Sequence, residues 1–193
     1  MLSYGTGYTD LSNATVPLFD VIVDLRVHSP SYKQHFTVVL DKPELSNVRE
    51  FIKSKIYKFA QEIMCSKDEV VITQSWINKS GKGESHHEHV HPNSMISGVW
   101  YPVINEQLPP IQFRSRSQRD IRRSTDKFNN FNSATFLLPM KMGEIIIFPS
   151  NLTHSVPANQ SDTERISLSF NTWCKGSLGD INSLTYLPLD RCV

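Results

Sequence analysis

Residues 85–103 read SHHEHVHPNSMISGVWYPV, and this stretch joins a cluster of histidines to an apolar segment of strand length. The cluster holds four of the 7 histidines of the chain, namely His86, His87, His89 and His91. In an extended segment, side chains two residues apart point the same way, so His87 with His89, or His89 with His91, can aim two imidazoles at one point. Neutral imidazole is a good ligand for iron, zinc, copper and nickel. The cluster therefore indicates either a specific metal site or a histidine-rich loop that binds metal only by chance.

A third ligand for such a metal site has one candidate among the histidines of the C-terminal half, His154. It follows the apolar segment EIIIF at 144–148, which has the length of a buried strand. The alternative for His154 is a buried imidazole whose nitrogens bond to the backbone. The ligand interpretation of His154 is favoured only because the chain also contains the histidine cluster at 86–91.

Eleven residues after His154, the segment RISLSFNTW begins at Arg165 and alternates polar and apolar side chains. Arg165, Ser167 and Ser169 share one face of the predicted strand, and the apolar residues share the other. A guanidinium that faces a cavity suits a carboxylate, to which its planar fork can donate two hydrogen bonds. The alternative is an ion pair at the edge of the sheet with Asp162 or Glu164.

The rest of the chain predicts short strands, and one helix near its start. Apolar segments separated by Gly-Lys-Gly, Pro-Asn, Pro-Pro and Lys-Met-Gly predict strands at 69–77, 96–103, 111–114, 134–139, 144–148 and 165–173. Two earlier strands are expected at 20–27 and 35–41. Residues 47–64 repeat apolar side chains every three or four positions, which predicts an amphipathic helix capped by Ser46 or Asn47. This order predicts a mainly β, α+β fold, a sandwich or jelly roll with the helix on its outside.

Length and composition restrict the class of protein further. The chain has 193 residues, and we expect residues 1–193 to form a single domain. Its 20 basic and 19 acidic side chains give a net charge of +1, which excludes an electrostatic grip on nucleic acid by the whole protein. No apolar run approaches the roughly 20 residues of a membrane helix. The 3 cysteines match neither a zinc site nor a disulfide scaffold, so we expect free thiols in a reducing cytoplasm.

The order of these motifs resembles the iron(II)/2-oxoglutarate-dependent oxygenases, in which an H-x-D/E pair precedes a distal histidine and then an arginine with a nearby serine. More narrowly, HVHPNSMISGVWYP at 89–102 is similar to the H-x-H-x-N-S-x-x-S-G-V-x-Y motif of small oxygenases of this type encoded by bacteria and phages. The resemblance covers about residues 70–175. It implies a double-stranded β-helix, a cupin-like jelly roll, with its motif-bearing core at about 69–175.

Residue by residue, the resemblance implies that His89, His91 and His154 bind iron(II). It also implies that Arg165, with Ser167 as its hydroxyl partner, binds the distal carboxylate of 2-oxoglutarate. The superfamily has Asp or Glu at the second ligand position, where this chain has His91. Three imidazoles leave the site one negative charge short, so another metal could also be favoured.

Other residues are candidates for the same site. His86 with Glu88 keeps the H-x-E order and is an alternative ligand pair. Three more residues are candidates for the 2-oxoglutarate pocket: Tyr101 on strand 96–103, Asn78 after strand 69–77, and Asn171 on the polar face of the last strand. In similar proteins, the strand before the histidine pair commonly contributes a residue to the cosubstrate.

Residues 112–127, QFRSRSQRDIRRSTDK, are strongly basic, with six cationic and two acidic side chains and hence a net charge of +4. The segment lies between the two motif blocks, where jelly-roll oxygenases often carry a substrate-facing insertion. Arg119, Arg122 and Arg123 are therefore candidates for binding an acidic substrate or partner, including nucleic acid. The alternative is a solvated loop.

The resemblance thus implies a dioxygenase that couples decarboxylation of 2-oxoglutarate to succinate with oxidation of an unidentified substrate by dioxygen. A first alternative is a three-histidine cupin that acts without 2-oxoglutarate and has no need of Arg165. A second is a non-enzymatic jelly-roll binding or assembly protein with a structural metal. The C-terminal segment with Tyr186 and Leu187 either packs on its own chain or pairs with a second subunit in a homodimer.

Overall fold

The computed structural model describes residues 38–103, 107–114, 124–129 and 132–189. The strand expected at 20–27 and the arginines Arg119, Arg122 and Arg123 lie outside these residues. The described chain begins with two short 3-10 turns, η1 (Val39–Asp41) and η2 (Pro43–Leu45). Helix α2 (Ser46–Lys58) follows and continues into one π-helical turn, η3 (Phe59–Ile63). The strands are β1 (Val70–Ser80), β2 (His86–His89), β3 (Ile96–Val103), β4 (Ile111–Arg114), β5 (Thr135–Leu138), β6 (Ile145–Pro149), β7 (His154–Val156), β8 (Arg165–Cys174), β9 (Ser177–Leu178) and β10 (Leu187–Pro188).

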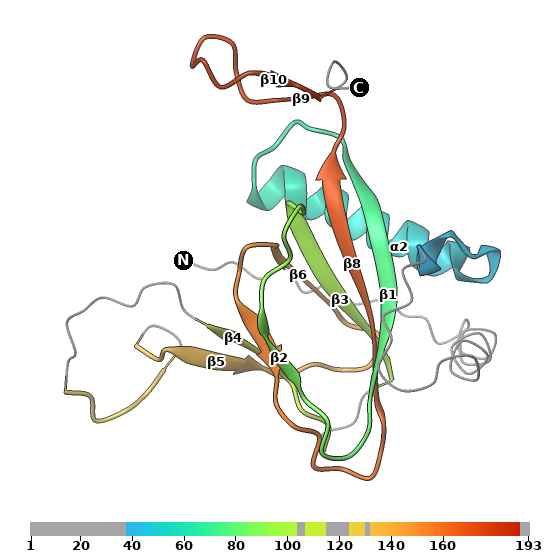
Figure 1. The fold of residues 1–193 in the computed structure, drawn as a ribbon, viewed down its shortest axis with the longest axis vertical. Coiled ribbons are helices and arrows are strands. Elements are labelled where there is room, and N and C mark those ends of the chain that lie inside the picture. The colour runs from blue at the N-terminus through green and yellow to red at the C-terminus, as the bar shows by residue number, and fades with distance from the viewer. Residues whose placement is uncertain (1–37, 104–106, 115–123, 130–131, 190–193) are drawn as a thin grey trace.

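Two four-stranded antiparallel sheets form the body of the molecule (Figure 1). The first has the order β1-β8-β3-β6 and the second the order β2-β7-β4-β5. Most neighbouring strands are distant in sequence, because the chain passes back and forth between the two sheets, as in a jelly roll; β4 and β5 are the exception, being consecutive strands of one sheet. The short hairpin of β9 and β10 extends beyond one end of the sheets (Figure 1). Among the described residues, no helix has both the length and the apolar character needed to cross a membrane.

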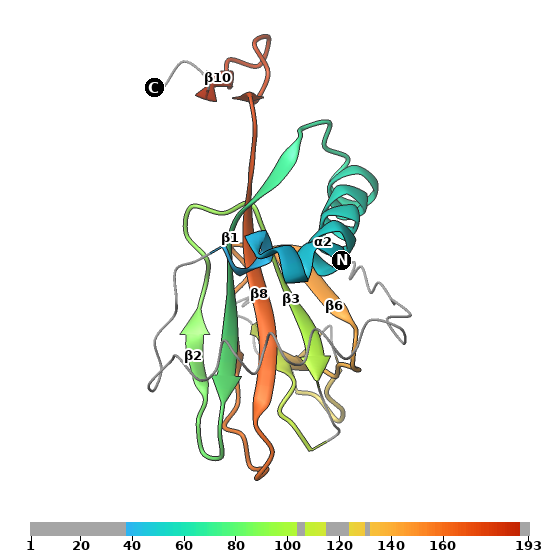
Figure 2. The ribbon, with the colours of Figure 1, turned by 90° about the vertical axis from the view of Figure 1, so that its right-hand side faces the viewer.

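Helix α2 covers the outer face of the first sheet (Figure 2). Its buried residues Val48, Ile52 and Ile56 pack in one cluster with Trp100, Leu168 and other side chains of that face. The contact is close at Gly98, where an added Cβ atom would lie 2.2 Å from the Phe170 ring. Glycine at this position therefore lets an aromatic ring fill the layer between helix and sheet.

The inner face of the first sheet is divided between apolar and polar side chains. Towards β6 it is apolar, and residues such as Tyr101 and Phe148 pack with Phe113 and Phe136 of the second sheet. Towards β1 and β8 it is polar, because β8 buries four polar side chains on this face: Arg165, Ser167, Ser169 and Asn171. The aromatic half joins the two sheets, and the polar half leaves hydrogen-bonding groups directed between them.

The structure confirms the mainly β fold and most predicted elements, with three corrections. Residues 39–41 of the strand expected at 35–41 form a 3-10 turn instead, with the amide of Asp41 bonded back to the carbonyl of Val38. The helix has no side-chain cap from Ser46 or Asn47, because the preceding η2 turn leads directly into it at Leu45. The histidine cluster, expected from the sequence in the turn between strands 69–77 and 96–103, lies largely on a strand, β2, because β7 pairs with it. The strands β3 and β4 have the predicted bounds.

Candidate metal and cosubstrate site

His89 and His154 come together because β2 and β7 pair with these two residues directly opposite each other. The β2–β7 register shifts between His86 and His89, so the pair contains a bulge. The bulge leaves His87 and Glu88 exposed and both His86 and His89 half-buried, with the rings of the latter two 4.4 Å apart between centres. The bulge brings the His86 ring closer to His89 than the exposed His87 ring, whose centre lies 5.3 Å from that of His89.

His91 reaches the same place from the turn that follows β2. Its backbone N–H donates to the carbonyl of Ser150 at 2.9 Å, which anchors this turn to the end of β6. Asn93 then adopts a φ of 55°, a left-handed conformation that asparagine tolerates better than most residues. The imidazole of His91 lies between Trp76 and Phe148, with ring centres at 5.6 Å and 6.4 Å.

The three imidazoles are oriented so that their Nε2 atoms converge. Nδ1 of His89 and of His154 lies 2.8 Å and 2.9 Å from the carbonyl oxygens of His87 and Leu152. Since a carbonyl only accepts, each Nδ1 carries the proton and each Nε2 keeps a lone pair. Nδ1 of His91 lies 2.5 Å from Oδ1 of Asn171. The three possible ligand atoms lie within 4.8 Å of one another, and Nε2 of His89 is 3.2 Å from Nε2 of His91.

The surroundings keep these imidazoles uncharged near neutral pH. Burial lowers the pKa of His154 to about 3, and it lowers the pKa of His89 and of His91 as well. His86 is affected in the same way, and burial lowers its pKa to about 4. Neutral imidazoles with free lone pairs are the form of histidine that binds a metal ion.

Arg165 begins β8 on the same interior face, and only 3% of its surface is exposed. Its Nε donates to the carbonyl of Pro109 at 3.1 Å, Nη1 to Ser167 Oγ at 3.3 Å, and Nη2 to the Tyr101 hydroxyl at 3.2 Å. Burial raises the pKa of Tyr101, although the Arg165 charge opposes this, so the phenol stays protonated. All three partners are neutral, and none offsets the charge of the guanidinium.

The structure excludes the edge ion pairs that were the alternative for Arg165. Asp162 pairs with Lys82 at 2.8 Å, and Glu164 pairs with Lys79 at 2.5 Å. Across the described residues, no carboxylate forms an ion pair with Arg165. The alternative ligand pair, His86 with Glu88, does not point to one site, because Glu88 lies at the surface and accepts hydrogen bonds from Arg114. On the interior face of β8 there is therefore a buried cation that has no counter-ion among the described residues.

The remaining predicted residues lie on the same interior face but bond to protein groups. Asn78 donates to Ser169 Oγ at 2.8 Å and accepts from the Trp76 indole at 3.1 Å. Asn171 contacts His91, Ser97 and Gln74. Sequence reasoning did not assign Trp76, Ser97 or Gln74 to the site, although the alternation of β1 and β3 places them on the faces of Asn78 and Tyr101.

Comparison with known proteins agrees with this arrangement. The model of a family described as “Putative 2OG-Fe(II) oxygenase” matches residues 74–171, which is more than half of the chain and contains all three histidines and Arg165. The chain belongs to this oxygenase family. No curated protein matched the sequence.

Solved structures of 2OG-Fe(II) oxygenases have the same fold. An oxidoreductase of this family from Burkholderia pseudomallei superposes with a TM-score of 0.55 at 12% identity, covering 86% of this chain and 91% of that chain. A prolyl-4-hydroxylase from Pseudomonas putida gives 0.57 at 10% identity, over 89% and 86%. HygX from Streptomyces hygroscopicus, solved with nickel and 2-oxoglutarate bound, gives 0.63 at 7% identity, over 88% and 81%. At these identities the likeness shows the fold, the double-stranded β-helix.

Proposed function

We propose that this oxygenase binds iron(II) through Nε2 of His89, His91 and His154. Two ligands at right angles, each about 2.1 Å from one ion, lie about 3.0 Å apart. The separation of 3.2 Å between Nε2 of His89 and Nε2 of His91 agrees with that requirement. Each Nδ1 is bonded to an oxygen, as is usual for metal-bound histidine. The His89–His91 pair therefore fits one metal ion, and His154 offers a third nitrogen within 4.8 Å of the other two.

The buried guanidinium of Arg165, which has no counter-ion among the described residues, is the observation that most strongly supports 2-oxoglutarate as the cosubstrate. A buried cation is costly unless an anion meets it. The hydroxyl hydrogens of Tyr101 and Ser167 have no acceptor among the described residues, and each oxygen accepts from Arg165. Guanidinium and two hydroxyls thus offer converging donors to one carboxylate, which we assign to the distal carboxylate of 2-oxoglutarate.

When bound, iron(II) and 2-oxoglutarate supply oxidative decarboxylation to succinate and carbon dioxide, coupled to oxidation of a substrate by dioxygen. The chain contributes the orientation of the ligands, the grip on the cosubstrate and the exclusion of water. In this proposal, the three imidazoles hold the ion, while Arg165, Tyr101 and Ser167 hold the far end of 2-oxoglutarate. The aromatic half of the interior closes one side of the site to solvent.

The decisive experiment mixes purified protein, iron(II) and 2-oxoglutarate without oxygen, then admits air and measures the succinate formed. We expect slow succinate formation without added substrate, and none when the metal is removed by a chelator. Oxygen consumption that depends on metal but not on 2-oxoglutarate would instead support the three-histidine cupin. Metal binding with no turnover of any kind would support a binding protein.

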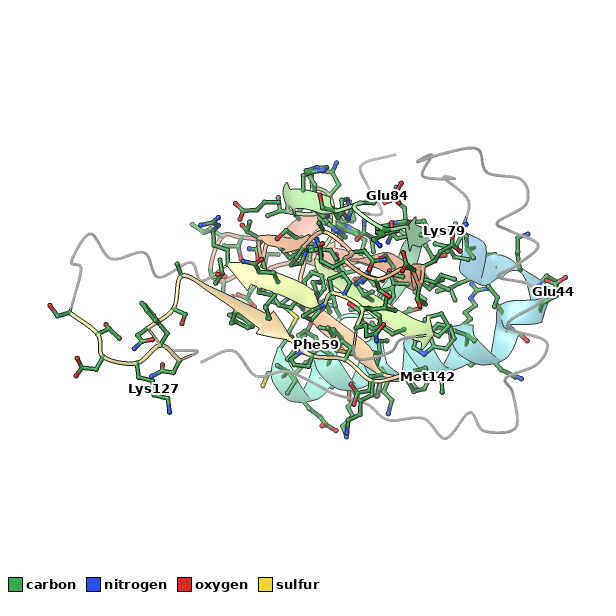
Figure 3. The ribbon with its side chains drawn as sticks, turned by 90° about the horizontal axis from the view of Figure 1, so that it is seen from below. Glu44, Phe59, Lys79, Glu84, Lys127 and Met142 are labelled. Carbon is green, nitrogen blue, oxygen red and sulfur yellow. The ribbon has the colours of Figure 1, made fainter. Side chains whose placement is uncertain are left out.

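The substrate and the cellular setting are part of the same proposal. We infer an acidic substrate from the net charge of +4 over residues 112–127, with Arg119, Arg122 and Arg123 as its contacts. Lys127, at the end of this segment, lies on a part of the chain that projects beyond the sheets (Figure 3).

The cytoplasm is the compartment that we propose, since Cys65 and Cys174 are free thiols.

A further inference from the structure

The orientation of His91 is determined differently from that of the other two histidines. His89 and His154 bond through Nδ1 to backbone carbonyls, which can only accept. Nδ1 of His91 meets two side chains, the carboxamide of Asn171 at 2.5 Å and the hydroxyl of Ser97 at 3.1 Å. A carboxamide can present either its oxygen or its NH₂ group, and a hydroxyl can donate or accept, so the tautomer of His91 depends on how these two side chains are held.

Two further side chains hold the Asn171 carboxamide. Its Nδ2 donates to Gln74 Oε1 at 3.1 Å, and its Oδ1 accepts from the Ser97 hydroxyl at 2.8 Å. Ser97 is fully buried and bonds in turn to Ser150 Oγ at 2.7 Å. Asn171 itself is 7% exposed. A network spanning β1, β3, β6 and β8 therefore directs the amide oxygen at His91.

We propose that Asn171 is a positioning residue that makes Nε2 of His91 a metal ligand, by accepting the proton of Nδ1. This inference rests on the three-histidine site proposed above. It assigns to Asn171 a role through His91 in place of contact with 2-oxoglutarate, since both ends of its carboxamide are already bonded. The side chains that hold the Nδ1 side of His91, namely Asn171, Ser97 and Gln74, are all neutral. A neutral imidazole at the second ligand position therefore has no charged hydrogen-bond partner.

The test is anaerobic titration of the full chain with cobalt(II) as the probe, followed by the d–d absorption of the bound ion. Asn171→Ala removes the nearer acceptor and leaves only the Ser97 hydroxyl, 3.1 Å from Nδ1. Loss of such a partner typically weakens metal binding by about 10- to 100-fold. Asn171→Asp restores an oxygen acceptor of almost the same shape, which Gln74 can meet by turning its own amide. We expect Asn171→Asp to bind cobalt(II) at least as tightly as the parent, with a shifted absorption band because a carboxylate makes the imidazole a stronger donor.

Thr172→Val is the matched control, because Thr172 is the next residue of β8, is fully buried, and bonds to Ile96 on the opposite face. It should leave the cobalt(II) affinity and spectrum unchanged even if it lowers stability. Parental affinity in Asn171→Ala, or no recovery in Asn171→Asp relative to Asn171→Ala, would overturn the role of Asn171 while leaving the metal site intact. No cobalt(II) binding by the parent would overturn the metal site itself, and with it this inference.

Discussion

Arg165 and Tyr101 contact each other in two ways: Nη2 of Arg165 donates to the Tyr101 hydroxyl at 3.2 Å, and Cζ of Arg165 lies 5.2 Å from the centre of the Tyr101 ring. Tyr101 is fully buried, so the ring is a rigid support for the guanidinium. The contact fixes the position of the cation without neutralising it. The buried charge thus remains available to an anionic ligand.

Arg165→Ala should weaken 2-oxoglutarate binding strongly while sparing the metal site. Removing one partner of a desolvated charge pair typically costs about 2–5 kcal/mol. At 1.4 kcal/mol per tenfold, this is roughly 30- to 4,000-fold in the dissociation constant. Arg165→Lys should recover part of the affinity, because it keeps the charge but loses the planar fork.

Anaerobic calorimetric titration of 2-oxoglutarate into metal-loaded protein measures this effect. Arg49→Ala is a suitable control, since Arg49 pairs with Asp41 on the exposed surface of α2 and lies on the helix side. Unchanged affinity in Arg165→Ala would contradict the carboxylate assignment.

Alanine at His89, His91 or His154 should abolish tight metal binding, because two imidazoles cannot complete one face of coordination. His87→Ala is the matched control: His87 belongs to the same strand, but the bulge leaves its side chain exposed. Metal content after dialysis, measured by elemental analysis, separates the four variants. Full occupancy in His91→Ala, with loss in His87→Ala or in Glu88→Ala, would show that another ligand pair binds the metal.

Gly98→Ala should destabilise the fold, because the new methyl group would lie 2.2 Å from Phe170 Cζ and 2.8 Å from the Ile146 carbonyl oxygen. Overpacking of this kind typically costs about 1–3 kcal/mol in the free energy of unfolding. Gly81→Ala is the comparison, since its nearest neighbour would be Glu84 at an ordinary 3.7 Å. Urea denaturation should show a lower midpoint for Gly98→Ala only, and equal midpoints would contradict the close packing at β3 and β8.

Charge reversal of Arg119, Arg122 and Arg123 to glutamate should weaken binding of an acidic probe, such as a labelled single-stranded oligonucleotide. The parent's binding should also weaken with added salt, since exposed charges are screened over about 8 Å at physiological ionic strength. Reversal of three exposed lysines, Lys53, Lys58 and Lys175, is the control for net charge. Fluorescence anisotropy at two salt concentrations measures both effects. Binding that ignores salt and the three arginines would argue against an acidic substrate.

Local pattern alone was enough to predict the strand bounds of β3 and β4, the helix near α2 and the polar face of β8. Period and alternation report which face of an element is buried, and that information is carried by neighbours in the sequence. The resemblance of the motifs added the family and the candidate ligands. The cap expected at Ser46 or Asn47 failed because the preceding η2 turn, not a side chain, begins the helix.

Tertiary structure decided how these elements combine at the site. A bulge against β7, invisible in the sequence of β2, half-buries His86 beside His89 and leaves His87 exposed. The pairing of β8 with both β1 and β3 brings Asn171 opposite Gln74 and Ser97. The sequence by itself therefore determined which residues have suitable chemistry and which faces they share. Only the register of strands distant in the chain determined which of them meet, because that register depends on the packing of the whole sandwich.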